Sequence, residues 1–159
     1  MKVWQLLIGV FLVVGGGVLF VVAVSGGFDG TPKAEIDAEY RCGDNCDGEY
    51  MELSVGEYEK LVAEKKSFVV MVDQGGCKTA DNLKKFVTEY AKTKGIKVYK
   101  MMFEDVKKTS LHDFVKYYPS VAVISKGKII GFLRADADED SDAYNKYDAF
   151  EAWANRYLK

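Results

Sequence analysis

Three residue types are scarce in this chain of 159 residues, which has three cysteines, two prolines and one histidine. Three cysteines are too few for a fold held together by a disulfide framework. A zinc site usually takes several histidine or cysteine ligands, and His112 has no second histidine to join it. The formal net charge is −2, so the chain lacks the basic excess typical of nucleic-acid binding. We therefore expect no metal site, no other cofactor and no nucleic-acid partner.

Charge is nearly absent from the first 24 positions, where the only charged side chain is Lys2. Val3–Val24 is apolar except for Gln5, and its 22 residues reach about 33 Å as a helix, enough to cross a hydrocarbon core about 30 Å thick. A cleavable signal has a shorter apolar region of about 7 to 15 residues, although residues 23–25 resemble a weak cleavage site. The sequence thus predicts an uncleaved transmembrane anchor over residues 1–24.

The charges that flank this segment predict its orientation. Lys2 and the amino terminus precede it, whereas three of the four charged residues between positions 29 and 37 are acidic. Positive residues favour the cytoplasmic side of a membrane. We therefore predict a single-pass protein of the cell membrane, with a cytoplasmic N-terminus and an extracytoplasmic C-terminal domain.

Residues 25–54 are predicted to form a linker, because they are rich in Gly, Asp and Glu and show no apolar period. Near the end of this linker, Cys42 and Cys46 lie close enough in sequence to close a small disulfide loop in an oxidising exterior. A second interpretation is that the pair exchanges and passes oxidation to or from Cys77, which requires the linker to fold back onto the domain. Under both interpretations Cys77 remains an odd thiol.

From Val55 onward the apolar pattern becomes periodic and predicts alternating helices and strands. The predicted order is helix Val55–Lys66, strand Ser67–Asp73, helix Ala80–Lys94, strand Ile96–Phe103, a short helix around Leu111–Tyr117, a hairpin of Val121–Ile124 and Ile129–Leu133, and a final helix Asp148–Leu158. A strand, helix and strand of this length imply a parallel pair with a crossover, and the hairpin adds an antiparallel edge. Residues 55–159 are therefore expected to form an α/β domain with a mixed sheet flanked by helices.

Cys77 stands between the first predicted strand and the helix that follows, directly after the turn Gln74–Gly76. At such a junction, free backbone N–H groups and the helix dipole favour the thiolate, which is the form that attacks disulfides. Ala80 occupies the position at which a dithiol enzyme carries its second cysteine. The sequence therefore predicts one reactive thiol without a resolving partner.

Residues 55–159 resemble the thioredoxin superfamily. The resemblance rests on Phe68–Val72, which leads through a short turn into Cys77, and on Tyr118–Ser120, which enters the hairpin. It implies a thioredoxin-like fold in which Cys77 is the nucleophile. It also implies that Pro119 follows a cis peptide bond and packs beside that nucleophile.

A closer likeness concerns Phe68–Cys77 followed by Leu83–Phe86. This part of the chain is most similar to membrane-anchored, bacteriocin-transport-accessory-type thioredoxin-like proteins of bacteria, which implies a place in the bacterial cell envelope. The chain also departs from the family pattern. Gly76 replaces a common tryptophan, Met71 falls where many members bury a proton-accepting aspartate, and Ala80 removes the resolving sulfur. Each of these departures weakens dithiol catalysis.

Two functions remain consistent with the residues. In the first, Cys77 takes part in thiol–disulfide exchange or captures protein or small-molecule disulfides as a monothiol oxidoreductase, and Lys78 either helps to hold the thiolate or is simply solvated. In the second, the domain is a redox-inactive binding module of a cell-envelope complex, and Cys77 is a small apolar residue in a decayed site.

The segment 136–142 carries five carboxylates. Their alternation resembles the start of an EF-hand loop, but Ser141 and Tyr147 occupy the positions of the required Gly and Glu, so a solvated loop is expected and a weak surface calcium site is the alternative. In a thioredoxin-like fold this connection runs beside the nucleophile. Its carboxylates, among them Asp138 and Asp140, are therefore predicted to raise the pKa of Cys77 and to attract cationic partners.

Overall fold

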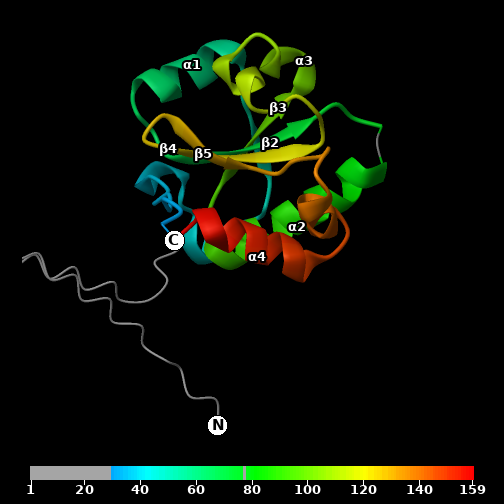
Figure 1. Ribbon diagram of the computed structural model, residues 1–159. Helices are drawn as coiled ribbons and strands as arrows, with labels where there is room; N and C mark the ends of the chain where they lie inside the picture. Colours follow the sequence, from blue (N-terminus) through cyan, green and yellow to red (C-terminus); the bar gives the residue numbers. More distant parts are fainter. Residues whose placement is uncertain (1–29, 77) are drawn as a thin grey trace, which may run out of the picture.

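Figure 1 shows the computed structural model, which describes residues 30–76 and 78–159. These residues form a central sheet with helices on both faces. The predicted anchor over residues 1–24 and Cys77 lie outside the described residues. Among the helices of the described ranges, none is both long and apolar enough to cross a membrane.

The sheet has five strands in the order β1-β3-β2-β4-β5. Their bounds are Tyr50–Glu52 for β1, Phe68–Asp73 for β2, Val98–Met102 for β3, Ser120–Ser125 for β4 and Lys128–Phe132 for β5. Strand β3 pairs in parallel with β1 and β2, whereas β4 pairs antiparallel with β2 and β5. This arrangement confirms the predicted mixed sheet with a parallel crossover and an antiparallel hairpin.

The α-helices of the described residues cover the sheet from two sides. They are α1 (Val55–Ala63), α2 (Lys78–Lys94), α3 (Phe103–Val106) and α4 (Tyr147–Tyr157), and short 3-10 helices occupy Ala38–Tyr40, Gly43–Asn45, Ser110–Asp113 and Asp138–Tyr144. In Figure 1, α1 and α3 lie on one face of the sheet and α2 and α4 on the other. Helix α2 begins at Lys78, after a short connection from the end of the central strand β2.

Local sequence signals explain where the helices begin and end. The Ser54 hydroxyl accepts the Glu57 N–H and caps α1. Helix α2 ends before Gly95, whose φ of +64° is the left-handed conformation typical of a helix terminus. The helix predicted around Leu111–Tyr117 is wrong in extent, because the structure has only the 3-10 turn Ser110–Asp113 there. The residues that follow lead into Pro119, and a residue before proline is disfavoured in the helical conformation.

The described part of the predicted linker, residues 30–54, differs from the expectation of a free connection. Ala34, Ile36 and Tyr40 are buried in the hydrophobic core, and β1 extends the sheet by pairing with β3. The Ala34 backbone N–H also donates to the Tyr157 carbonyl at 2.6 Å. The contacts are few and widely spaced along the chain, so they leave no apolar period for a sequence pattern to detect.

Strand β2 is the rigid centre of the domain, since all six of its residues are buried. On one face, Phe68 packs edge-to-face with Tyr58 of α1 and Tyr99 of β3, at centroid distances of 6.3 and 5.7 Å. On the other face, the buried side chains of α2 and α4 include Leu83 and Trp153. Burial on both faces fixes the end of β2, and with it the turn that leads to the candidate site.

Candidate functional site

The structure places a strand, a turn and a helix around sequence position 77, as predicted. Strand β2 ends at Asp73, residues 74–76 form the turn, and α2 begins at Lys78. Gly75 and Gly76 have φ values of +76° and +68°, a conformation that side chains with a Cβ rarely adopt. An added Cβ at Gly76 would meet no other atom within 4 Å. The backbone conformation, and not a lack of space, therefore accounts for glycine where the resembled family has tryptophan.

Asp73 holds this turn in place, and it is a site residue that the sequence analysis missed. Its carboxylate is almost fully buried, accepts the Gly75 N–H at 3.1 Å through Oδ1, and contacts the Lys84 ammonium at 2.6 Å through Oδ2. Burial raises the pKa of Asp73, but the Lys84 ammonium and the Gly75 N–H outweigh it and leave the pKa below its ordinary value. The carboxylate is therefore ionised and pins the turn to α2.

Pro119 follows a cis peptide bond, as the resemblance implied. The buried Tyr144 hydroxyl lies 3.0 Å from the Pro119 carbonyl oxygen and 3.1 Å from the Leu133 carbonyl oxygen, so its single proton is shared between these two acceptors. Burial, together with the charge of Asp140, raises the pKa of Tyr144 far above its ordinary value, so the hydroxyl keeps its proton. The predicted packing of Pro119 beside Cys77 lies outside the described residues.

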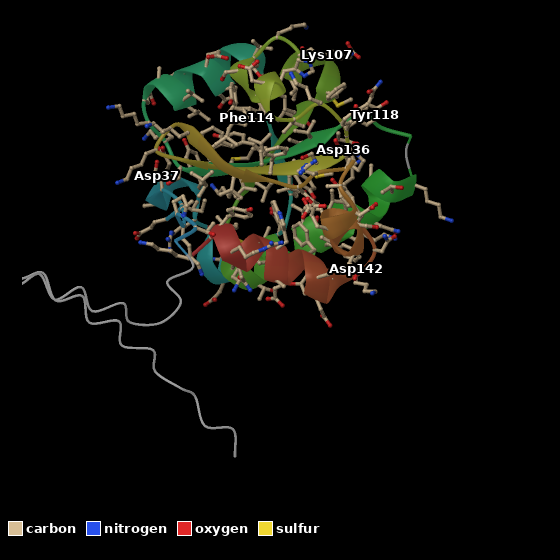
Figure 2. The ribbon with its side chains drawn as sticks, viewed as in Figure 1. Asp37, Lys107, Phe114, Tyr118, Asp136 and Asp142 are labelled. Atoms are coloured by element: carbon tan, nitrogen blue, oxygen red, sulfur yellow. A yellow bond between two sulfur atoms is a disulfide. The ribbon has the colours of Figure 1, made fainter. Side chains whose placement is uncertain are left out.

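A cavity of about 480 Å³ joins the first turn of α2 to the cis proline and the acidic segment. Thr79 lines it from α2, Tyr118 and Pro119 line it from the loop before β4, and Asp136 and Asp138 line it from the connection after β5. Figure 2 shows Tyr118 and Asp136 at the end of the sheet from which the turn to α2 leaves. The connection after the hairpin therefore runs beside the start of α2, as predicted.

Only part of the acidic segment lines this cavity, and Asp140 is not in the solvated position expected for this loop, although its effect on Cys77 stays a prediction. Asp140 is 8% exposed, and its Oδ2 accepts the backbone N–H of Arg134 at 2.8 Å. Glu139 and Asp142 are paired with basic side chains, at 3.3 Å from Arg134 and 3.1 Å from Lys146 respectively. The negative charge lining the cavity therefore comes from Asp136 and Asp138.

The other predicted modulators differ in exposure. Lys78 is exposed on the first turn of α2, in accordance with a solvated lysine. Ala80 is only 1% exposed, so its methyl group packs into the domain and a sulfur at that position would be shielded from solvent. Within residues 30–76 and 78–159, no three Asp, Glu, His or Cys side chains come together in a way that could hold a metal ion.

Cys42 and Cys46 form a disulfide, as the loop interpretation predicted. The loop is fixed beyond the last turn of α2, where the Gly95 carbonyl accepts the Cys42 N–H at 2.9 Å. Helix α2 has 17 residues and spans about 25 Å, so the disulfide and Lys78 lie at opposite ends of it. The predicted linker does fold back, but to the wrong end for exchange with a thiol at the start of α2. This geometry favours a structural role for the pair.

Comparisons with known proteins identify the fold. No family model matches the chain, and no curated protein matches it. The solution structure of oxidised thioredoxin from Plasmodium falciparum is similar with a TM-score of 0.52 at 15% identity, over 70% of this chain and 100% of that one. A structure described for thiol resolution in the yeast mitochondrial 1-Cys peroxiredoxin by glutathione and thioredoxin systems is similar with a TM-score of 0.51 at 13% identity, over 67% and 93% of the two chains. The described domain therefore has a thioredoxin fold.

Proposed function

We propose that this chain is a membrane-anchored, extracytoplasmic thioredoxin-like protein that uses Cys77 as a single thiol to capture or exchange disulfides. The observation that carries the proposal is the cavity shared by Thr79, Pro119 and Asp138, because it provides room for a partner beside the start of α2. The fold supports thiol–disulfide chemistry in general. The anchor over residues 1–24 rests on the apolar sequence of that segment.

The chemistry follows from having one thiol. The Cys77 thiolate attacks one sulfur of a partner disulfide, a mixed disulfide forms, and the other partner sulfur leaves as a thiolate that takes up a proton. Because Ala80 supplies no second sulfur, release needs an external thiol, whose thiolate attacks the partner sulfur of the mixed disulfide and returns Cys77 to its reduced form. The mixed disulfide is therefore expected to persist.

The charges of the cavity define the class of partner. Asp136 and Asp138 are exposed at its rim, and the ion pair of Asp136 with Arg134 is long at 3.8 Å. Carboxylates in a concave surface attract cationic segments and repel acidic ones. The proposed partners are therefore envelope proteins, or small disulfides, that carry positive charge next to their disulfide. The closer likeness to bacteriocin-transport-accessory-type proteins supports a bacterial cell-envelope setting.

Trapping in membranes tests this function. Membranes that contain the full-length protein are quenched with an alkylating agent and separated by non-reducing electrophoresis, with Cys77→Ser as the variant and the double variant Cys42→Ser/Cys46→Ser as the control. We expect adducts in the unsubstituted chain and in the control, and none in Cys77→Ser. Adducts of equal pattern in all three proteins would reject Cys77 as the capturing thiol. Removal of residues 1–24 should release the protein from the membrane fraction, and retention would reject the anchor.

A redox-inactive binding module is the second candidate, and exposed aromatic side chains favour it. Phe114, Tyr117 and Tyr118 are 48%, 57% and 38% exposed, although large apolar side chains are usually buried. A partner that docks on these rings needs no thiol. Co-purification of the same partner by Cys77→Ser and by the unsubstituted chain under reducing conditions would support the module, whereas its loss from Phe114→Ser/Tyr117→Ser would map the surface.

A further inference from the structure

Asp73 and Lys84 form an ion pair that brackets Cys77 in the sequence. The two charged atoms are 2.6 Å apart, and the side chains are 5% and 28% exposed, so the pair is largely removed from water. Asp73 lies at the end of β2 and Lys84 in the second turn of α2. Met71, two residues earlier on the same face of β2, is apolar and fully buried. On that face of β2, the Asp73 carboxylate is therefore the charged group next to the turn.

The remaining polar groups around the pair come from α2 and β1. The Asp81 carboxylate lies 4.0 Å from the Lys84 ammonium but is 65% exposed, so water screens it. The Tyr50 hydroxyl of β1 donates to the Lys84 carbonyl at 2.9 Å. Burial raises the pKa of Tyr50 to about 12, with the Asp73 charge adding to the rise, so this hydroxyl is neutral at physiological pH. Asp73 is thus buried and Lys84 is half-buried, and their opposite charges balance one another.

We propose that Asp73 and Lys84 act as a pair of positioning residues that fix the turn leading to Cys77 and hold the charge beside its thiol close to zero. The proposal rests on the proposed thiol function of Cys77. Asp73 reaches the turn directly, because its Oδ1 accepts the Gly75 N–H. Lys84 reaches it from the helix that Lys78 opens. The other charged residues at the start of α2 and in the cavity are exposed, so water screens them; they are Lys78, Asp81, Asp136 and Asp138.

Single substitutions unbalance the pair with opposite signs. In Asp73→Asn the amide oxygen can still accept the Gly75 N–H, while the Lys84 ammonium loses its partner and favours a nearby thiolate. In Lys84→Gln the Asp73 carboxylate is left alone and disfavours the thiolate. Four residues span at most about 14 Å, so one charge at this range, at an effective dielectric between those of water and protein, moves a pKa by about half a pH unit. A pKa shift of that size changes the fraction of Cys77 present as thiolate, and hence its alkylation rate at a pH below the pKa, roughly threefold.

The experiment is the rate of iodoacetamide labelling of Cys77 against pH, in the full-length protein in detergent with the Cys42–Cys46 disulfide intact. The midpoint of this pH–rate curve reports the pKa of Cys77. We expect the midpoint to fall by about half a pH unit in Asp73→Asn, to rise by about as much in Lys84→Gln, and to return to the unsubstituted value in the double variant. Asp81→Asn is the matched control, since its carboxylate also faces Lys84 but is 65% exposed, and it should move the midpoint much less than either substitution in the pair.

The outcomes separate this inference from the proposed function. A purely structural pair would lower the stability in both single variants without moving the midpoint, and that result would overturn the inference alone. Midpoints that shift in the same direction in the two variants would also overturn it. If Cys77 of the unsubstituted protein is not labelled at any pH below the unfolding range, the proposed function fails, and the inference fails with it.

Discussion

Replacing Tyr144 by phenylalanine should loosen the loop that carries the cis proline. Only the hydroxyl group is removed, and its single proton is shared between the carbonyls of Pro119 and Leu133, at 3.0 and 3.1 Å. The Leu133 carbonyl keeps a second donor, the Ser120 hydroxyl at 2.7 Å. The Pro119 carbonyl is left without this donor in a buried place. Leaving a buried carbonyl unsatisfied costs about 1–3 kcal/mol, so we expect Tyr144→Phe to lower the free energy of unfolding by about 2 kcal/mol.

Urea unfolding followed by tryptophan fluorescence measures this loss, since Trp153 is buried in α4. For a domain of this size the same loss lowers Tm by about 6–10 °C. Tyr157→Phe is the matched control, because its half-buried ring covers Gly131 and its hydroxyl makes no hydrogen bond to the described residues. This control should change stability by less than about 0.5 kcal/mol. Equal losses in the two variants would refute a special role for the Tyr144 hydroxyl.

Three further predictions concern the scaffold of the site. Gly127→Ala should cost about 3 kcal/mol in urea unfolding, because the glycine has a φ of +73° and its new Cβ would collide with the Val62 carbonyl oxygen. Breaking the Cys42–Cys46 disulfide by a double substitution to serine should cost about 2 kcal/mol for a five-residue loop and leave the alkylation rate of Cys77 unchanged. The lowered pKa of Asp73 should make the unsubstituted protein lose stability as the pH falls below about 3.8, and Asp73→Asn should flatten that limb of a pH–stability curve.

Controls make these three predictions independent of one another. Gly43→Ala also places a side chain at a positive φ, of +55°, but in open space, so it should cost only about 1 kcal/mol. If Gly127→Ala lost no more stability than Gly43→Ala, the predicted collision with the Val62 carbonyl oxygen would be contradicted. A change in the alkylation rate of Cys77 after removal of the disulfide would favour the interpretation that Cys42 and Cys46 exchange with Cys77. The free energy of unfolding should fall, and not rise, at acid pH, because a carboxylate with a lowered pKa stabilises the fold above its ordinary pKa and loses that effect on protonation.

The parts of the fold that sequence could predict are those in which each residue carries its own signal. The apolar run of β2, the Lys126–Lys128 turn of the hairpin and the amphipathic α2 are visible from neighbours a few positions apart. Strand β1 was missed because it has only three residues, which end in the exposed Glu52. Its place in the sheet depends on pairing with β3, far along the chain.

The site shows the same division between local and distant causes. Pro119 and the acidic connection could be placed from the resemblance, because both follow from chain order around the hairpin. The Asp73–Lys84 pair could not, since its contact depends on how α2 is rotated against β2. The burial of Asp140 was not predicted for the expected solvated loop, for a similar reason. Asp140 lies in the 3-10 helix Asp138–Tyr144, its carboxylate accepts the backbone N–H of Arg134, and it is not among the residues that line the cavity.

The most direct test of the central claim is the rate at which Cys77 of the full-length protein forms a mixed disulfide with two model peptides. Both peptides carry the same disulfide, flanked by arginines in one and by glutamates in the other. We expect the arginine peptide to react about threefold to tenfold faster at low salt, with the difference shrinking at high salt and in Asp136→Asn/Asp138→Asn. Equal rates for the two peptides, or mixed disulfides that form equally well in Cys77→Ser, would contradict a single thiol guided by an acidic cavity.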